Sequence, residues 1–477
     1  MTARIGTFRR PQLALLLSVL FACTAFSSPA TAQAPAPEES PDAVEFPDYV
    51  AVTDGGEVVL TPETAAWWAS ERNTKLRIQR QRIDEAEGQF QQAEAADDLT
   101  VSASASAIRL GPVTTVELPA AEGEEPTSVQ VTPDQQWSAT ISARKPIYTA
   151  GRTNLGEMIA REGIDAAQIG TDVAGLSISQ GARSAGYGVL RAVQLTGIAA
   201  AQVTALAEHV RNAEAMEDAG VVPHFDVVQA RTELARAQED LITAQTGIEQ
   251  VKAQLRQLLA LPQETAVQVE DAPPPVMPVG DLPELIDTAQ SVRPEVAAAQ
   301  SGLRIAELNR KLAARELKPS VAVTGQYTRQ TAAGFSGAGY SWQIGVVAEK
   351  PILDGGRKRG MVQSADARVE QAQLELQSAQ EQVALEVVQA WLSVQEAGER
   401  ITTAQQGVVE ARERRRMAQL RYREGLAAGI EVIDADTALA AAEASLVNAE
   451  YDRQLAVTQL RTAMGVMGTP RQEGETQ

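Results

Sequence analysis

The hydrophobic positions of this chain follow two periods, one typical of helices and one typical of strands. Residues 355–424 contain no Pro, and their apolar positions recur every seven residues. The heptad positions are Val387, Val394, Ile401 and Val408, followed three places later by Ala390, Ala397, Ala404 and Ala411. This is coiled-coil spacing, and Ala at alternate contact positions lets helix backbones approach closely. The pattern predicts a long helix with a neighbour packed along it.

Segment lengths indicate how such helices combine. The helical segment from about 150 to 219 holds roughly 70 residues, whereas 62–98 and 225–261 hold about 37 each. Two short helices stacked end to end would match one long helix, which at 1.5 Å per residue spans on the order of 100 Å. We therefore expect antiparallel coiled-coil hairpins that are longer than an ordinary domain.

Four shorter runs alternate strictly between apolar and small polar residues, as strands with two different faces do. They lie at 99–107, 137–144, 321–328 and 341–348. Each has about the length that crosses a bilayer when tilted, and strands between lipid and water alternate in this way. Aromatic residues lie in or beside the runs, as interfacial girdles require: Trp137, Tyr148, Tyr327, Phe335, Tyr340 and Trp342. Alternation alone leaves a second interpretation open, a soluble antiparallel sheet packed on a helix.

Four strands in one chain cannot close a barrel. An open edge in hydrocarbon would leave backbone groups unpaired, so closure has to come from other chains. Because outer-membrane barrels begin at about eight strands, an eight-stranded dimer or a twelve-stranded trimer would suffice. A lumen wide enough for solute favours the trimer. The loops at 111–136 and 330–339 would then lie outside the cell.

The sequence repeats itself and so divides into two halves. An offset of 205 residues aligns Lys145-Pro146-Ile147-Tyr148 with Lys350-Pro351-Ile352-Leu353 and continues without a gap. The Pro-rich stretch 270–278 between the halves can neither continue a helix nor pair in a central strand. The predicted parts are a signal peptide (1–32), an N-terminal extension (33–59), a first repeat (60–262), a linker (263–280), a second repeat (281–468) and a C-terminal tail (469–477).

The N-terminus has the order of a secretory signal peptide. Three Arg precede an apolar run from Leu13 to Ala22, and small residues follow at Ala30-Thr31-Ala32. We expect cleavage after Ala32. Lipidation of Cys23, the single cysteine, is the alternative, but the bulky Phe21 fits a lipoprotein cleavage box poorly. Simple cleavage would leave the mature chain without cysteine.

Charge and composition exclude several function classes. The 477 residues include 42 basic and 62 acidic side chains; without residues 1–32 the balance is 39 to 62, a net charge of −23. Such a surface repels nucleic acid, whose binding depends on cationic neutralisation of phosphates. His209 and His224 have no metal-spaced partners, and no nucleophile with its base can be assembled. We expect no enzyme activity, no cofactor, no metal site and no nucleic-acid partner.

Taken together, these residues resemble the TolC-type family of outer-membrane efflux and secretion proteins, from Leu60-Thr61-Pro62-Glu63 to the region of Gly465. The resemblance rests on the duplicated strand-to-helix element and on two hairpin tips. The tips read Gly220-Val221-Val222-Pro223-His224-Phe225-Asp226-Val227 and Tyr422-Arg423-Glu424-Gly425 through Glu431-Val432-Ile433-Asp434-Ala435. It implies a mainly α fold with a small transmembrane β part: a homotrimer with a twelve-stranded barrel in the outer membrane and an α-helical tunnel across the periplasm, closed at its far tip.

The same resemblance implies functional positions at the tips. Asp226, Glu431 and Asp434 fall where acidic residues guard the pore, and Tyr422 falls where a Tyr links hairpins. The basic residue expected at position 427 is Ala427, so the link must be weaker or built differently. These acids also suit helix-start positions, where a carboxylate stabilises a helix by about 0.3 to 1 kcal/mol. Both roles are compatible.

Docking of a periplasmic adaptor is expected near the same tips. The candidate positions are Gly220, Gly425 and Arg416. Arg416 belongs to a basic run at 412–423, for which a solvated face paired with neighbouring acids is the other interpretation.

The predicted function is a passive outer-membrane duct, gated at its periplasmic tip, that exports substrates from an adaptor and an inner-membrane transporter. The alternative is a secreted periplasmic coiled-coil adaptor or scaffold, for which heptads and secretion would suffice. The amphipathic strands and the duplication argue against it. The sequence leaves open the cargo, small molecule or polypeptide, and the identity of the pump.

Overall fold

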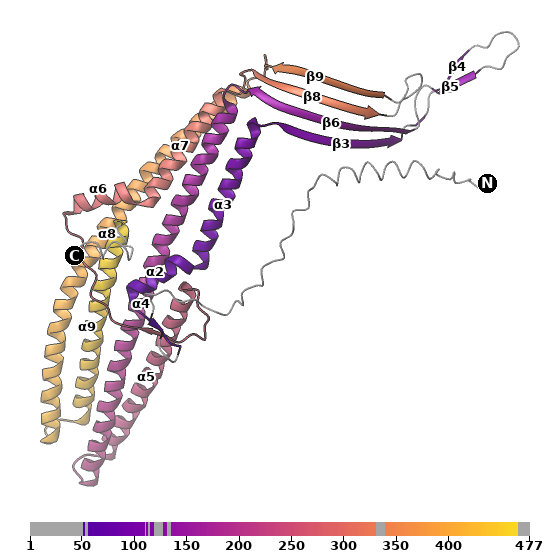
Figure 1. The fold of residues 1–477 in the computed structure, drawn as a ribbon. Helices are drawn as coiled ribbons and strands as arrows, with labels where there is room; N and C mark the ends of the chain where they lie inside the picture. The colour runs from indigo at the N-terminus through magenta and orange to yellow at the C-terminus, as the bar shows by residue number, and fades with distance from the viewer. Residues whose placement is uncertain are drawn as a thin grey trace, which may run out of the picture. The chain divides into compact units, whose positions relative to one another are not determined.

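The computed structural model describes residues 51–52, 56–109, 111–112, 115–118, 127–130, 135–330 and 339–465, most of them helical (Figure 1). The first half contains β1 (Ala51–Val52), β2 (Val58–Leu60), α2 (Pro62–Arg72), α3 (Thr74–Glu94), a 3-10 turn (Ala95–Asp97), β3 (Thr100–Arg109), β4 (Thr115–Leu118), β5 (Thr127–Gln130), β6 (Gln135–Tyr148), α4 (Arg152–Asp218), α5 (His224–Leu258) and β7 (Val267–Val269). The second contains α6 (Leu282–Val292), α7 (Pro294–Ala314), β8 (Ser320–Gln330), β9 (Gly339–Glu349), α8 (Arg357–Arg423) and α9 (Gly429–Ala463).

The helices of the two halves match in length one by one. α4 and α8 have 67 residues each, α5 and α9 have 35, α3 and α7 have 21, and α2 and α6 have 11. α4 packs along α3 and α5, and α8 packs along α7 and α9 (Figure 1). In each half, shorter helices thus pack along one long helix, as the segment lengths predict.

The prediction of a single helix over 62–98 is wrong, because the chain breaks at Asn73 between α2 and α3. Asn73 has an extended ψ of 131°, and its side-chain oxygen accepts a hydrogen bond from the backbone N–H of Lys75 (2.9 Å). The corresponding break in the second half falls at Arg293. There Pro294 follows, and a residue before proline is disfavoured in a helix.

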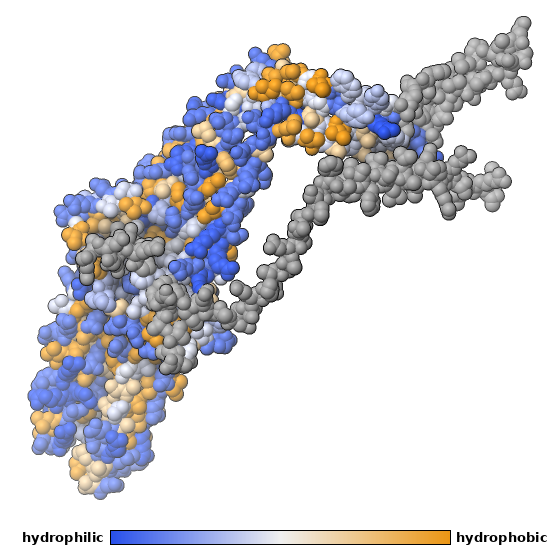
Figure 2. All heavy atoms as spheres, in the orientation of Figure 1, coloured by the Kyte–Doolittle hydropathy of each residue, from blue (hydrophilic) through white to orange (hydrophobic). Residues whose placement is uncertain are grey.

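Four strands form one antiparallel sheet in the order β3-β6-β8-β9. Its register places Ser102 opposite Ser142 and Thr140 opposite Thr328, with the hydroxyl oxygens of these pairs 2.7 and 3.1 Å apart on one polar face. The other face is apolar and carries Val101, Ala103, Trp137, Ile141, Tyr327, Trp342, Ile344 and Val346. Figure 2 shows hydrophobic residues gathered over this sheet, whereas hydrophilic residues prevail over the helices. The four alternating runs are therefore strands of one amphipathic sheet.

The edges of this sheet are open within the described residues. β3 pairs only with β6, and β9 pairs only with β8. Every residue of both edge strands is exposed. The backbone groups along the outer side of each edge are thus available to another chain.

Two smaller sheets escaped the sequence analysis. β2 pairs antiparallel with β1 and parallel with β7, which lies inside the predicted linker but ends before its Pro-rich stretch. β4 and β5 form a hairpin within the segment that was expected to be a loop between β3 and β6. Strands of two to four residues are too short to show a period.

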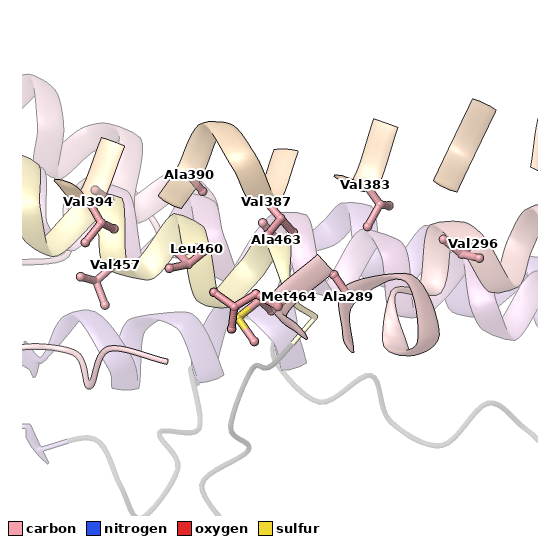
Figure 3. Close-up of a cluster of buried hydrophobic side chains, with 12 residues drawn as sticks. Ala289, Val296, Val383, Val387, Ala390, Val394, Val457, Leu460, Ala463 and Met464 are labelled. Carbon is pink, nitrogen blue, oxygen red and sulfur yellow. The ribbon is translucent and has the colours of Figure 1, made fainter. Parts of the chain in front are cut away.

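A buried apolar core joins α6, α7, α8 and α9. Its members are Leu285, Ala289, Val296, Val383, Val387, Ala390, Val394, Ala456, Val457, Leu460, Ala463 and Met464. Figure 3 shows the side chains of α8 directed toward those of α9 and toward Ala289 of α6. Val387 and Ala390, two of the predicted heptad positions, are fully buried here. The heptad seam therefore stabilises the second hairpin by roughly 1.5 to 3 kcal/mol for each fully buried Val or Leu.

Several predicted features lie outside the described residues: the signal peptide (1–32) with Cys23, most of both strand-joining loops, Phe335, and the tail (469–477). Among the described residues, α4 contains one stretch that could cross a membrane by length and composition alone. This helix packs along α2, α3, α5, α7 and α9.

Candidate functional site at the hairpin tips

The two helical hairpins, α4 with α5 and α8 with α9, turn in the same way. Their long helices end before Gly220 (φ 72°) and Gly425 (φ 71°), both in the left-handed region that favours glycine. The N–H of the residue after each glycine donates to a carbonyl in the last helical turn, at 2.9 Å in the first tip and 2.8 Å in the second. This Schellman-type turn satisfies backbone groups that the helix end leaves open.

The three predicted pore acids lie at the starts of the return helices. Asp226 and Glu431 occupy the first turns of α5 and α9, and Asp434 follows in α9. Asp434 is exposed, while Oε2 of Glu431 lies 3.2 Å from Nη1 of Arg421. Within the described part of one chain, no group of three acidic, His or Cys side chains could hold a metal ion.

Tyr422, the predicted linking residue, is buried against the first hairpin. Its ring packs on His209 of α4, with centroids 5.2 Å apart and planes inclined by 49°. Gly429, the first residue of α9, lies against both rings: a Cβ there would be 3.4 Å from Nε2 of His209 and 3.7 Å from Cε2 of Tyr422. The Tyr422 hydroxyl is buried without a hydrogen-bond partner among the described residues. Tyr422 thus contacts the first hairpin through its ring.

An ion pair with a buried acid and a partly exposed Arg lies behind this contact. Asp436, two turns along α9 from Gly429, is 6% exposed, and its Oδ1 lies 2.5 Å from Nε of Arg415 in α8. Removing Arg415 would leave the buried charge of Asp436 poorly solvated. We call the following five residues the tip cluster: His209, Arg415, Tyr422, Gly429 and Asp436.

Burial shifts the titration of the tip cluster. It lowers the pKa of His209, against the opposing effect of the charges on Asp436 and Asp226. It raises the pKa of Asp436, which the charge of Arg415 opposes. Burial also raises the pKa of Tyr422, and the charge of Asp226 adds to this effect. The closed cluster therefore favours a neutral His209.

Sequence reasoning gave His209 no role, because its partners lie on the other hairpin. One local signal was present: Met216 follows it by seven residues and so shares its face of α4. Met216 packs against an apolar group of α8 and α9 that includes Tyr422 and Val432. The spacing of His209 and Met216 on one face of α4 was the sequence signal that His209 could be buried.

The candidate docking glycines are surrounded by exposed apolar side chains. Gly220 and Gly425 are themselves exposed. Beside them Val221, Phe225 and Leu426 are 59%, 70% and 71% exposed. Such an exposed apolar group at the end of a hairpin is typical of a protein interaction surface.

Most of the basic run at 412–423 is paired with acids. Arg416 is exposed and pairs with Glu413 of its own helix at 2.7 Å. The other pairs are Arg412 with Glu443, Arg415 with Asp436, and Arg421 with Glu431. This arrangement favours a solvated, paired face over a dedicated cationic surface.

Comparison with known proteins adds to this geometry. The sequence matches the model of a family described as outer membrane efflux protein over residues 68–261 and 285–466. The chain belongs to the outer membrane efflux protein family. Membership makes it a protein of the outer membrane, in a family described by efflux and not by an enzyme activity.

Relatives within this efflux family are distant. The chain is 25% identical over 280 residues to outer membrane efflux protein BepC of Brucella suis, covering 57% of this chain and 60% of BepC. It is 24% identical over 302 residues to TolC of Escherichia coli K12, covering 59% of this chain and 60% of TolC. It is 24% identical over 244 residues to the E. coli K12 cation efflux system protein CusC, covering 50% and 52%. The chain thus aligns with less than two thirds of each curated relative.

Solved structures share the fold over most of the chain. The outer membrane protein VceC of Vibrio cholerae superposes with a TM-score of 0.68 at 22% identity, covering 85% of this chain and 96% of VceC. The outer membrane channel CmeC of Campylobacter jejuni gives 0.70 at 16% identity, covering 87% and 88%. The family fold is therefore present in this chain.

Proposed function

We propose that this efflux-family protein is a passive export channel that assembles as a homotrimer. The four-stranded sheet is the observation that carries the proposal. Three copies would supply a twelve-stranded barrel, with β9 of one copy pairing with β3 of the next and no edge left in hydrocarbon. The apolar face would meet lipid and the Ser, Thr and Gln face a water-filled lumen. The repeats at 60–262 and 281–468 would each contribute two strands and one hairpin, and the hairpins would form a tunnel in the periplasm.

We place the gate of this channel at the hairpin tips. Asp226, Glu431 and Asp434 from three copies would surround one axis and attract cations. Tyr422 would keep the second hairpin against the first. The location of Asp226 and Glu431 in the first turns of α5 and α9 supports this, because the positive end of each helix holds a carboxylate at the tip.

We further propose that an adaptor joins the tips to an inner-membrane transporter. Gly220 and Gly425 lie beside the exposed Val221, Phe225 and Leu426, which supports an apolar docking surface. Arg416 would lie farther up the second hairpin, at the margin of that surface. The cargo remains broad: CusC is named for cation efflux, whereas BepC is named only for efflux, so small molecules and polypeptides both fit a duct.

Cysteine cross-linking tests the assembly. In a Cys23→Ser background, Ser104→Cys on β3 is combined in turn with Ser341→Cys, Gln343→Cys or Gly345→Cys on β9. We expect at least one combination to give covalent trimers, on a non-reducing gel, from detergent-extracted outer membranes.

The matched control lies within one chain. Ser102→Cys with Ser142→Cys joins positions whose hydroxyl oxygens are 2.7 Å apart, so its disulfide should leave a monomer band. If this control oxidises while every combination of β3 with β9 stays monomeric, the trimeric barrel is wrong. A protein that stays in solution without detergent would instead support the periplasmic scaffold.

A further inference from the structure

In the tip cluster, α4 contacts α8 through His209 and Tyr422. Along their lengths, α4 packs on α5 and α9, while α8 packs on α7 and α9. The side chain of His209 lies against Gly429 of α9, which has no side chain, and packs on the ring of Tyr422 of α8. A branched side chain at position 429 would occupy the space through which the two rings touch.

The residues of the tip cluster, together with the neighbouring Met216, form pairs seven positions apart, and such pairs lie on one face of a helix. These pairs are His209 and Met216 in α4, Arg415 and Tyr422 in α8, and Gly429 and Asp436 in α9. In α9 this face meets α4, which packs along it, and in α8 it meets α4 at Tyr422. His209 is among the buried residues of this contact, 5% exposed.

We infer that His209 holds the second hairpin against the first and so keeps the tip of the channel closed. The inference rests on the gating function proposed above. Ala427 offers no polar side chain for a link between hairpins, and the Tyr422 hydroxyl has no partner among the described residues. At Tyr422, ring packing rather than a hydrogen bond therefore makes the contact between the hairpins. Separating them would expose both rings to water.

Protonation should loosen this contact. The titratable and charged groups around His209 come from four helices and are Glu208 of α4, Asp226 of α5, Arg415 and Tyr422 of α8, and Asp436 of α9. Because burial lowers the pKa of His209, the open, hydrated state binds its proton more readily than the closed state. Closure is thus fully stabilised above the ordinary His pKa of about 6.5 and weakened as the pH falls below it. Protonation of Asp436, whose pKa burial raises, acts in the opposite sense.

Conductance of the reconstituted full-length protein in planar bilayers tests the inference. Wild type, His209→Ala, His209→Phe and His224→Ala are compared at about pH 7.5 and about pH 5.5, on either side of the ordinary His value. His224 is the only other histidine of the chain and is exposed, which makes it the matched control. At the higher pH we expect a several-fold larger closed-state conductance for His209→Ala and an unchanged one for His209→Phe and His224→Ala.

The comparison of the two pH values distinguishes a gating role of His209 from a purely structural one. Acid should raise the conductance of wild type and His224→Ala, and this rise should be lost in His209→Phe, which keeps a ring but cannot be protonated. Equal acid responses in wild type and His209→Phe would overturn the inference, as would wild-type closure in an assembled His209→Ala trimer. If His209→Ala fails to assemble, the His209→Phe comparison alone decides. A wild-type protein that never conducts would contradict the channel proposal instead.

Discussion

Single residues give the two duplicated tips different roles. At the repeat offset of 205, His224 corresponds to Gly429 and Glu217 to Tyr422. In the first tip, Nδ1 of His224 lies 2.8 Å from Oε1 of Glu217, and both side chains are accessible to water. An exposed pair of this kind contributes about 0 to 1 kcal/mol. In the second tip, glycine and tyrosine at the same positions allow burial against His209. The same backbone turn thus occurs in both tips, with an exposed ion pair in the first and a buried ring contact in the second.

Tyr422 provides a residue-scale prediction. Because its hydroxyl has no partner in the described chain, Tyr422→Phe should change the free energy of unfolding by less than about 1 kcal/mol and leave the tip closed. Tyr422→Ala removes the ring and should cost about 3 to 5 kcal/mol, with a larger closed-state conductance. Chemical unfolding in detergent and bilayer recording measure the two effects. Equal leakage of the Phe and Ala variants would show that the hydroxyl, not the ring, closes the tip.

The breaks between α2 and α3 and between α6 and α7 occupy corresponding places in the two repeats but use different side chains. Asn73 donates from Nδ2 to the carbonyl of Leu258 at 2.8 Å, at the end of α5. Arg293, at the corresponding break, donates from Nη1 to the carbonyl of Ala463 at 3.2 Å, at the end of α9. Both side chains therefore join a break to the last turn of a return helix. Arg293 also pairs with Glu386 at 3.0 Å, a connection to α8.

Truncating either side chain should loosen the element that it holds. Asn73→Ala removes the cap of α3 and the hydrogen bond to the carbonyl of Leu258, which should cost about 1 to 2 kcal/mol. Arg293→Ala leaves partly buried acids without their cation and should cost about 2 to 3 kcal/mol. The controls are Asn212→Ala, at an exposed position of α4, and Arg416→Ala in an exposed pair, each within about 0.5 kcal/mol of wild type. The free energy of unfolding is measured in detergent. A loss in the two controls as large as the loss in Asn73→Ala and Arg293→Ala would contradict this prediction.

Periodic features were predictable from the sequence, and contacts distant in sequence were not. Val387 and Ala390 lie in the core because a heptad repeats the same face at every second turn. The strands followed from a period of two over eight or more residues. The break at Asn73 has no Pro or Gly to mark it in the sequence. It is held by a hydrogen bond to a carbonyl of α5, a partner distant in sequence. The contact of His209 with Tyr422 likewise joins two hairpins that the sequence pattern treats separately.

At the scale of the whole molecule, the proposed trimer multiplies the charge of each tip. Three copies would bring three Asp434 side chains, exposed and unpaired in the described chain, toward one axis. Glu431 differs, because Arg421 lies 3.2 Å away and balances part of its charge. A narrow passage of low dielectric constant focuses the field of its lining charges and concentrates cations. Within α9, each copy thus holds one unbalanced acid, Asp434, and one balanced acid, Glu431, near the gate.

This balance predicts that two substitutions shift ion selectivity in opposite directions. Asp434→Asn removes the unbalanced carboxylate, so the channel should become less cation-selective and less sensitive to block by divalent cations. Arg421→Gln releases the charge of Glu431, so both properties should increase. Reversal potentials of the reconstituted protein under a monovalent salt gradient, recorded with and without an added divalent cation, measure these shifts. Phe225→Ala, an uncharged change at the exposed first tip, serves as the control and should match wild type. If all four proteins gave the same reversal potential and the same block, Asp434 and Glu431 would lie outside the ion path.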